Sequence, residues 1–144
     1  MSVDPIAFLR TAELLKEQVD EAHSRTSIGR SYYAAFLHFR ERLRQIGLEK
    51  IKHPSREAHA FVIQCLQFSE VTEGVKASCH LHDLQQIRED ADYHLEKDFS
   101  QNDAEDAFAK AQKVISDYEN QMTAEKKKTL LEKASKYAKL KDWL

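Results

Sequence analysis

The chain has 144 residues, of which 42% are hydrophobic and 32% are charged, which suits one domain with a packed core and a heavily charged surface. Its 3 glycines and 2 prolines are too few for the turns of a β-sandwich or barrel, or for collagen-like and low-complexity sequence. The 22 basic and 24 acidic residues give a net charge of -2, which excludes a global field that steers the chain to nucleic acid or membrane.

The cysteines and the N-terminus bear on the compartment. Cys65 and Cys79 lack CxxC spacing and are too few for a disulfide framework, so we expect free thiols in a reducing cytosol. The first ten residues lack the basic region and apolar core of a secretory signal. The longest apolar run, Tyr32 to Leu37, is too short to span a bilayer. We therefore expect a cytoplasmic, soluble protein with no membrane partner.

Charge is distributed unevenly along the chain. Residues 1–122 carry 15 basic and 21 acidic side chains, whereas residues 123–144 carry 7 lysines and three acidic residues. Five arginines lie between residues 25 and 44, and nine acidic residues lie between residues 83 and 106. This pattern indicates a local anion-binding surface and a local cation-seeking surface, with solvated helix faces as the alternative.

The sequence predicts helices only, and capping residues indicate where the first two begin and a glycine where the second ends. The first begins near Asp4, which can cap it, with Pro5 at the first helical position. The second begins near residues 24–26, runs to about Ile46 and is ended by Gly47. Their apolar stripes recur at helical spacing. The stripes are Phe8, Leu9, Ala12, Leu15 and Val19 in the first helix, and Ile28, Tyr32, Ala35, Phe36, Phe39 and Leu43 in the second.

Three further helices follow in the same way. Pro54 opens the third, Gly74 lies near the start of the fourth, and Ser100, Asn102 or Asp103 caps the fifth. Their stripes are Phe61, Val62, Cys65, Leu66 and Phe68, then Val75, Cys79, Leu81, Leu84, Ile87, Ala91 and Leu95, then Ala107, Phe108, Ala111, Val114, Ile115 and Tyr118.

Residues 123–144 form a lysine-rich amphipathic segment that either continues the fifth helix or makes a sixth. Such a helix binds a membrane surface, nucleic acid or a partner groove, or else docks on its own domain. We predict one domain, with a helical bundle over residues 1–122 and a C-terminal extension of it over residues 123–144. The fold class is all-α, an antiparallel four- to five-helix up-and-down bundle with a basic C-terminal helix.

The segment from Cys79 to Asp83 is the strongest candidate for a metal site. His80 and His82 point about 200° apart on a helix, so they cannot bind one ion. Either remaining pair, Cys79 with His82 or His80 with Asp83, supplies two ligands where structural zinc has four. Scattered glycines exclude a Walker loop and a dinucleotide fingerprint. We therefore expect neither a metal nor a cofactor.

Two segments carry chemistry that composition does not explain, Gly29–Phe36 and Leu84–His94. In the second, Arg88 and Asp92 are four residues apart and can pair on one helix face. Arg88 and His94 together form a minimal set for phosphodiester cleavage. The Arg binds phosphate through charge-assisted hydrogen bonds, and the His exchanges a proton near neutral pH. In RNA the 2′-hydroxyl can be the nucleophile, so no metal is required.

These segments resemble the HEPN superfamily, small helical bundles of prokaryotic toxin–antitoxin, antiphage and nucleotidyltransferase-associated systems. The similar branch reads Arg-Ser-Tyr-Tyr-Ala-x-Phe, here Arg30 to Phe36, and Arg-x-x-Ala-Asp-Tyr, here Arg88 to Tyr93. The stretch Lys52–Phe61 resembles its lysine–histidine segment. The resemblance covers about residues 5–120 and implies a helical bundle that forms a homodimer.

The resemblance also implies a function. Catalytic members are metal-independent endoribonucleases with an Arg, four to six residues and then a His, and two copies form the RNA-cutting cleft. Arg88 would then bind the scissile phosphate and His94 would be the general acid/base. The candidates for RNA or partner binding are Arg30, Arg40, Asp92 and Tyr93.

Two other functions remain open. One is a non-catalytic adaptor that binds a nucleotidyltransferase, an antitoxin-type partner or a nucleotide. The other is a helical oligomerisation module. For Arg88 the alternative to catalysis is an ion pair with Asp92 or with an acidic residue of a neighbouring helix.

Overall fold

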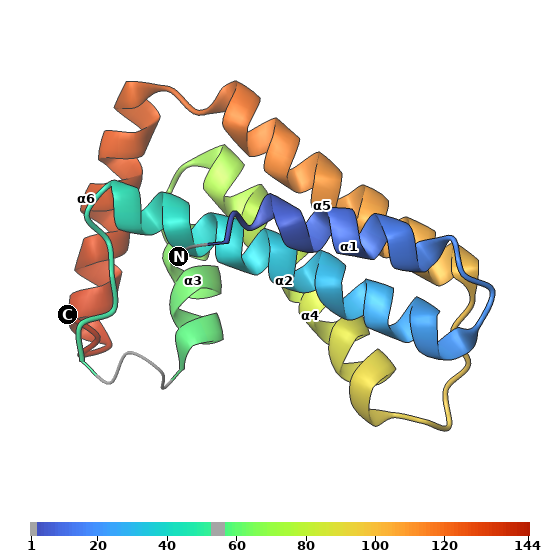
Figure 1. Ribbon diagram of the computed structural model, residues 1–144. Helices are drawn as coiled ribbons and strands as arrows, with labels where there is room; N and C mark the ends of the chain where they lie inside the picture. The colour runs from blue at the N-terminus through green and yellow to red at the C-terminus, as the bar shows by residue number, and fades with distance from the viewer. Residues whose placement is uncertain (1–2, 53–56) are drawn as a thin grey trace. The chain divides into compact units, whose positions relative to one another are not determined.

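The computed structural model describes residues 3–52 and 57–144, and within these ranges it is all-helical and contains no strand (Figure 1). The prediction of an all-α chain is therefore confirmed. The helices are α1 (Ile6–Lys16), α2 (Glu21–Gln45), α3 (Ala58–Gln67), α4 (Thr72–Tyr93), α5 (Gln101–Gln121) and α6 (Ala124–Leu140).

Side-chain caps and one glycine set the ends of the first two helices. The Asp4 carboxylate accepts the amide of Ile6 at 3.0 Å, as the sequence predicts. The predicted start of the second helix is a few residues too late, because Asp20 accepts the amide of Ala22 at 2.7 Å and begins α2 there. Gly47, with φ +95°, ends α2 in a Schellman motif.

The predicted start of the third helix, at Pro54, lies outside the described residues. The fourth helix begins at Thr72, so Gly74 lies inside its first turn. A Cβ there would lie 2.5 Å from Ser69 Oγ and 3.2 Å from the Leu66 carbonyl, so this close approach requires glycine.

The last two helices are separate and each has its own cap. Ser100 and Asp103 form a capping box at the start of α5, in which the Ser100 amide donates to the Asp103 carboxylate at 2.8 Å. Thr123 accepts the amide of Lys126 and begins α6. The lysine-rich end is therefore a sixth helix and not a continuation of the fifth.

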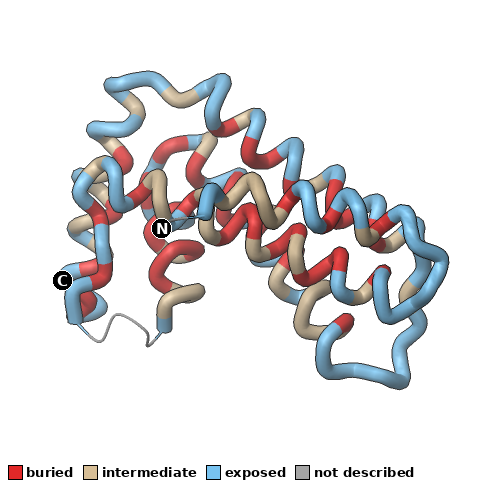
Figure 2. The backbone as a smooth tube through the Cα atoms, viewed as in Figure 1, coloured by how far each residue is buried: buried red, intermediate tan, exposed pale blue. Residues whose placement is uncertain are grey.

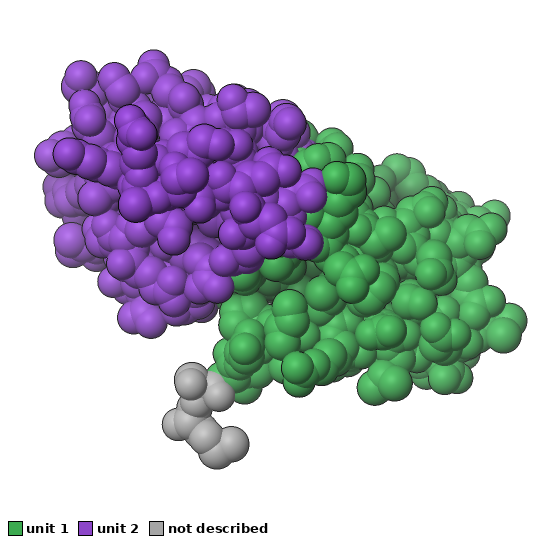
Figure 3. Space-filling view, turned by 90° about the horizontal axis from the view of Figure 1, so that it is seen from above, with its two compact units in different colours: residues 1–38, 80–115 green, residues 39–79, 116–144 purple. Residues whose placement is uncertain are grey.

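The chain divides into two compact units, which Figure 3 colours separately. Unit 1 comprises Met1–His38 and His80–Ile115, and unit 2 comprises Phe39–Cys79 and Ser116–Leu144. The sequence of unit 1 holds 8 basic and 14 acidic residues, a net charge of -6, and that of unit 2 holds 14 and 10, a net charge of +4. The predicted boundary at residue 122 falls within unit 2.

Unit 1 consists of α1, most of α2, the second half of α4 and most of α5. Contacts pair α1 with α2 and α2 with α4 in antiparallel directions, and an ion pair between Lys110 and Asp83 joins α5 to α4. For example, Arg25 donates a hydrogen bond to the Ala91 carbonyl, and Arg88 donates one to the Tyr33 hydroxyl. Buried residues face inward (Figure 2), and many are alanines, which allow the helices to approach closely. The alanines are Ala12, Ala34, Ala35, Ala91, Ala104, Ala107 and Ala111.

Some residues assigned to the apolar stripes are not in the core. Val19 and Leu95 are exposed because α1 ends at Lys16 and α4 ends at Tyr93, so neither residue is helical. Cys79 is also exposed.

In unit 2, α6 packs against α3. Trp143 is buried against Phe61, and its indole N–H donates to the Glu57 carboxylate at 2.8 Å. Tyr137 stacks on Phe68, which is part-exposed and not inward as predicted, and donates to Gln64 at 2.5 Å. Of the alternatives predicted for residues 123–144, the structure shows a helix that packs within its own unit.

None of the helices in the described ranges combines the length and the apolar composition needed to cross a bilayer.

Candidate functional site

Arg88 lies in unit 1, on the face of α4 that packs against α2. Its side chain is only 14% exposed. Nη2 donates to the Tyr33 hydroxyl at 2.7 Å, and Nε lies 3.2 Å from Asp92 Oδ2, one turn further along α4. The predicted Arg88–Asp92 pair is therefore present.

Aromatic rings surround the same guanidinium. Its central carbon lies 5.2 Å from the centroid of Tyr33 and 5.9 Å from those of Tyr32 and Tyr93. Burial opposes the charge of Arg88, but the hydrogen bond to Tyr33 and the carboxylate of Asp92 outweigh it and raise the pKa of the guanidinium. Arg88 therefore keeps its positive charge at any physiological pH.

Most of the donors of Arg88 are not used inside the protein. A guanidinium has five N–H donors. Among the described residues, Arg88 makes one hydrogen bond, to Tyr33, and its buried Nε has no aligned acceptor. Nε is enclosed beside Asp92, so the donors left for an oxyanion that reaches this 14% exposed side chain are those on the two Nη atoms.

His94 follows the last residue of α4, and its side chain is 51% exposed. Nδ1 lies 3.0 Å from the carboxylate of Glu96, and Nε2 lies 3.8 Å from Asp90. A hydrogen bond from its own backbone amide, and then the one from His94, hold the pKa of Glu96 below its usual value. The part-exposed imidazole thus has one nitrogen in contact with a carboxylate, that of Glu96, and a second nitrogen further from one, that of Asp90.

Arg88 and His94 have different partners. No hydrogen bond or ion pair joins them in the part of the chain that the structure describes. Arg88 points toward α2, whereas His94 belongs to the segment that leaves α4. The two side chains share the C-terminal end of one helix, and any joint chemistry requires a ligand that reaches both.

The other predicted residues are distributed over both units. Tyr93 is 70% exposed and contacts Arg88 through its ring. Arg30 lies over the ring of Phe8, at 5.7 Å, in unit 1. Arg40 belongs to unit 2, where it lines a cavity of about 300 Å³. Of the six candidates, the structure therefore brings together Arg88, Asp92 and Tyr93.

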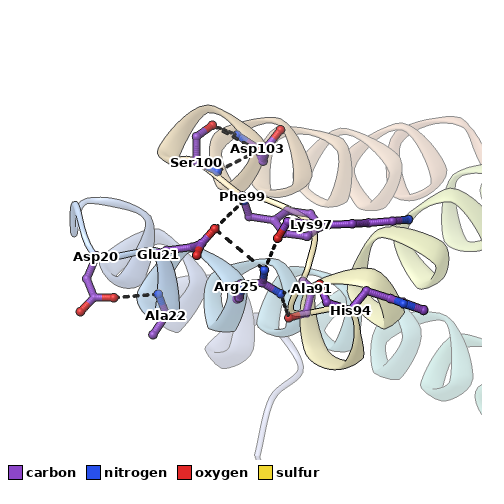
Figure 4. A network of polar contacts seen from close by, with 10 residues as sticks. All are labelled: Asp20, Glu21, Ala22, Arg25, Ala91, His94, Lys97, Phe99, Ser100 and Asp103. Atoms are coloured by element: carbon purple, nitrogen blue, oxygen red, sulfur yellow. Dashed lines mark hydrogen bonds and ion pairs between the residues drawn. The ribbon is translucent and has the colours of Figure 1, made fainter.

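Two residues of the site were missed by the sequence analysis. Tyr33 entered the sequence analysis only as part of the Arg30–Phe36 motif, yet its hydroxyl accepts a hydrogen bond from Arg88. Arg25, which the sequence analysis includes only among the five arginines between residues 25 and 44, donates to backbone carbonyls around His94 (Figure 4). One signal was available for Arg25. The end of α4 has neither a basic residue in its last turn nor a glycine after it, which leaves its carbonyls to water or to a donor from another helix.

The histidine-rich stretch of α4 does not form a metal centre in the described structure. In residues 3–52 and 57–144, no group of three or more His, Cys, Asp or Glu side chains is arranged to hold an ion. His53, which belongs to the lysine–histidine segment, lies outside the described residues.

Comparison with known proteins adds no relative, because no protein family, no curated protein and no solved structure matches this chain.

Proposed function

We propose that this chain is a HEPN-superfamily protein and a metal-independent endoribonuclease, a toxin or defence effector that cuts RNA at the cleft of a homodimer. One observation carries the proposal. A charged guanidinium with most of its donors unused, that of Arg88, and a part-exposed imidazole facing a carboxylate, that of His94, lie at the same end of α4.

The proposed chemistry uses the 2′-hydroxyl of RNA as nucleophile. Nε2 of His94 accepts the 2′-hydroxyl proton while the oxygen bonds to phosphorus, and the P–O5′ bond breaks. The leaving 5′-oxygen takes its proton from the second His94 of the dimer, which enters the step as the imidazolium, whereas the first His94 enters it neutral. The products are a 2′,3′-cyclic phosphate and a 5′-hydroxyl. Arg88 binds the non-bridging oxygens, where negative charge increases in the transition state.

Glu96 has a supporting role in this proposal. Its lowered pKa keeps it ionised at neutral pH, so it accepts the Nδ1 proton of His94. That hydrogen bond leaves Nε2 without a proton and ready to act as the base. A carboxylate beside a histidine orients the ring in the same way in other hydrolytic sites.

The test is cleavage of an end-labelled RNA of mixed sequence in EDTA, which removes metal-dependent contaminants. We expect His94→Gln to lower the rate by about 10²–10⁴-fold, the usual contribution of a general acid/base. The matched control is His82→Gln, since His82 is an exposed histidine of α4, and we expect it to cut like the wild type. The proposal is wrong if the wild type leaves RNA intact, or if His94→Gln cuts as fast as the wild type.

A second function, that of an adaptor, is favoured by the charge of unit 1. Glu89, Asp90, Asp92 and Glu96 surround the candidate pair, and the unit carries a net charge of -6. Such a surface repels an RNA backbone and attracts a basic protein surface. Salt-sensitive binding of a purified nucleotidyltransferase, without RNA cleavage, would support this function instead.

A further inference from the structure

The C-terminal end of α4 has no cap of its own. The last carbonyls of any helix lack intrahelical partners, and the helix dipole gives them a partial negative charge. The last turn of α4 contains no basic residue, and residues 94–100 contain no glycine that could close the helix. The donors for these carbonyls therefore come either from water or from another part of unit 1.

Arg25, on α2, supplies them. Its Nη1 donates to the Ala91 carbonyl at 2.7 Å and to the His94 carbonyl at 3.3 Å, and its Nη2 donates to the Lys97 carbonyl (Figure 4). One guanidinium thus binds the end of α4 and the turn that follows it. The positive charge also lies where the helix dipole favours a cation.

Arg25 is itself held in position. Its side chain is 12% exposed and lies 4.9 Å from the centroid of the Phe99 ring. Glu21, one turn earlier on α2, lies 3.9 Å from Nη2 and accepts the amide of Phe99 at 2.8 Å. The segment that leaves α4 is therefore bound at both ends, by Arg25 and by Glu21, as Figure 4 shows.

The bound segment carries the imidazole of His94, its carboxylate neighbour Glu96, and Lys97, which pairs with the second neighbour, Asp90 of α4. Glu96 contacts Nδ1 at 3.0 Å, and Lys97 fixes Asp90, on the other side of the ring, at 2.9 Å. Glu96 and Lys97 follow α4 and are outside any helix, so the turn that Arg25 binds sets where they lie.

We infer that Arg25 is a positioning residue. By binding the carbonyls of Ala91, His94 and Lys97 it fixes the turn that aims the His94 imidazole, and it does not touch RNA. The catalytic consequence rests on the proposed function, whereas the positioning itself does not. A lysine at this position would keep the charge but would lose the planar fork that reaches several carbonyls at once.

The experiment compares Arg25→Gln and Arg25→Lys with the wild type, and Arg10→Gln is the control because Arg10 is an exposed arginine of α1. The first readout is amide hydrogen exchange of the full chain, residue by residue. In Arg25→Gln we expect exchange at Lys97 and Phe99 to be at least about 10-fold faster, because local opening then requires less free energy. Arg25→Lys should be intermediate, and amides in the middle of α2 should not change.

The second readout is RNA cleavage. We expect Arg25→Gln to lower kcat by about 10–100-fold, since small misplacements of a catalytic group cost that much, and to leave KM within about twofold. A merely structural arginine would lower the fraction of active protein and leave the pH dependence of kcat unchanged. A positioning arginine changes that pH profile as well, because the contact between His94 and Glu96 is disturbed.

The outcomes separate the two proposals. Unchanged exchange at Lys97 and Phe99, or faster exchange throughout unit 1 to the same degree, would overturn the positioning role. If the wild type does not cut RNA, the proposed function fails while the exchange data still decide whether Arg25 positions His94. Local exchange with an unchanged kcat and pH profile would also overturn the role of Arg25 in catalysis.

Discussion

The hydrogen bond between Arg88 and Tyr33 is expected to make a measurable contribution to folding. It joins residues on different helices at 2.7 Å. Tyr33→Phe removes the hydroxyl and keeps the ring, whose centroid lies 5.2 Å from the guanidinium carbon, so the cation–π contact remains. The substitution therefore removes this hydrogen bond and keeps the ring, and the double-mutant cycle with Arg88 measures the contribution of their contact.

The expected loss follows from the setting of the bond. A hydrogen bond to a charged group contributes about 1.5–3 kcal/mol. The Arg88 side chain is 14% exposed, so solvent screens the bond little, but Asp92 remains as an ion partner at 3.2 Å. We therefore expect the lower end, a decrease of about 1.5 kcal/mol in the free energy of unfolding. For a chain of this size that lowers Tm by about 3–6 °C.

The assay is urea unfolding followed by circular dichroism, in a double-mutant cycle of Tyr33→Phe with Arg88→Met. The coupling free energy should be about 1.5 kcal/mol. Tyr93→Phe is the control, because Tyr93 faces the same guanidinium but is 70% exposed, and it should change the stability little. A coupling below about 0.5 kcal/mol, within the additivity expected of independent sites, would refute the reasoning.

Three further predictions concern the fold. Gly47→Ala should destabilise the protein by about 1–2 kcal/mol in urea unfolding, because φ at Gly47 is +95°. Gly29→Ala, inside α2, should instead stabilise it by about 0.5–1 kcal/mol. Equal effects of the two substitutions would contradict this. A thiol reagent should label exposed Cys79 in the native state and spare buried Cys65, whose pKa burial raises to about 12. The pKa of Glu73 is lowered, first by a hydrogen bond from a lysine of α6. Glu73→Gln should therefore decrease the free energy of unfolding at neutral pH, and this decrease should vanish as the pH falls through the lowered pKa. An equal decrease at pH 3 would be evidence against the pair.

The helices were predictable because burial recurs at helical spacing. In α2, Ile28, Tyr32, Ala35, Phe39 and Leu43 are the buried stripe that the sequence predicts. Apart from exposed residues within α4 such as Cys79, the pattern fails where a helix ends, because an apolar residue beyond the last turn keeps the helical spacing but is not part of the helix. The exposed residues after α1 and α4 are of this kind.

The candidate site was predictable only in its local part. The Arg88–Asp92 pair follows from positions four apart on one helix. The hydroxyl of Tyr33 comes from a residue 55 positions away, and the periodicity of the second helix indicates no partner for this oxygen. A pattern of burial carries no information on which polar atoms meet across helices.

The five arginines between residues 25 and 44, which the sequence predicts as a local anion-binding surface, show the same limit of sequence patterns most clearly. Arg25 and Arg30 belong to unit 1, where one caps α4 and the other lies over an aromatic ring. Arg42 and Arg44 belong to unit 2, where each pairs with a carboxylate. Arginines that are neighbours in the sequence thus serve different local partners, because α2 turns each in a different direction. An anion that approached α2 would have to compete with those partners, whereas Arg88, which has one hydrogen bond among the described residues, retains donors for it.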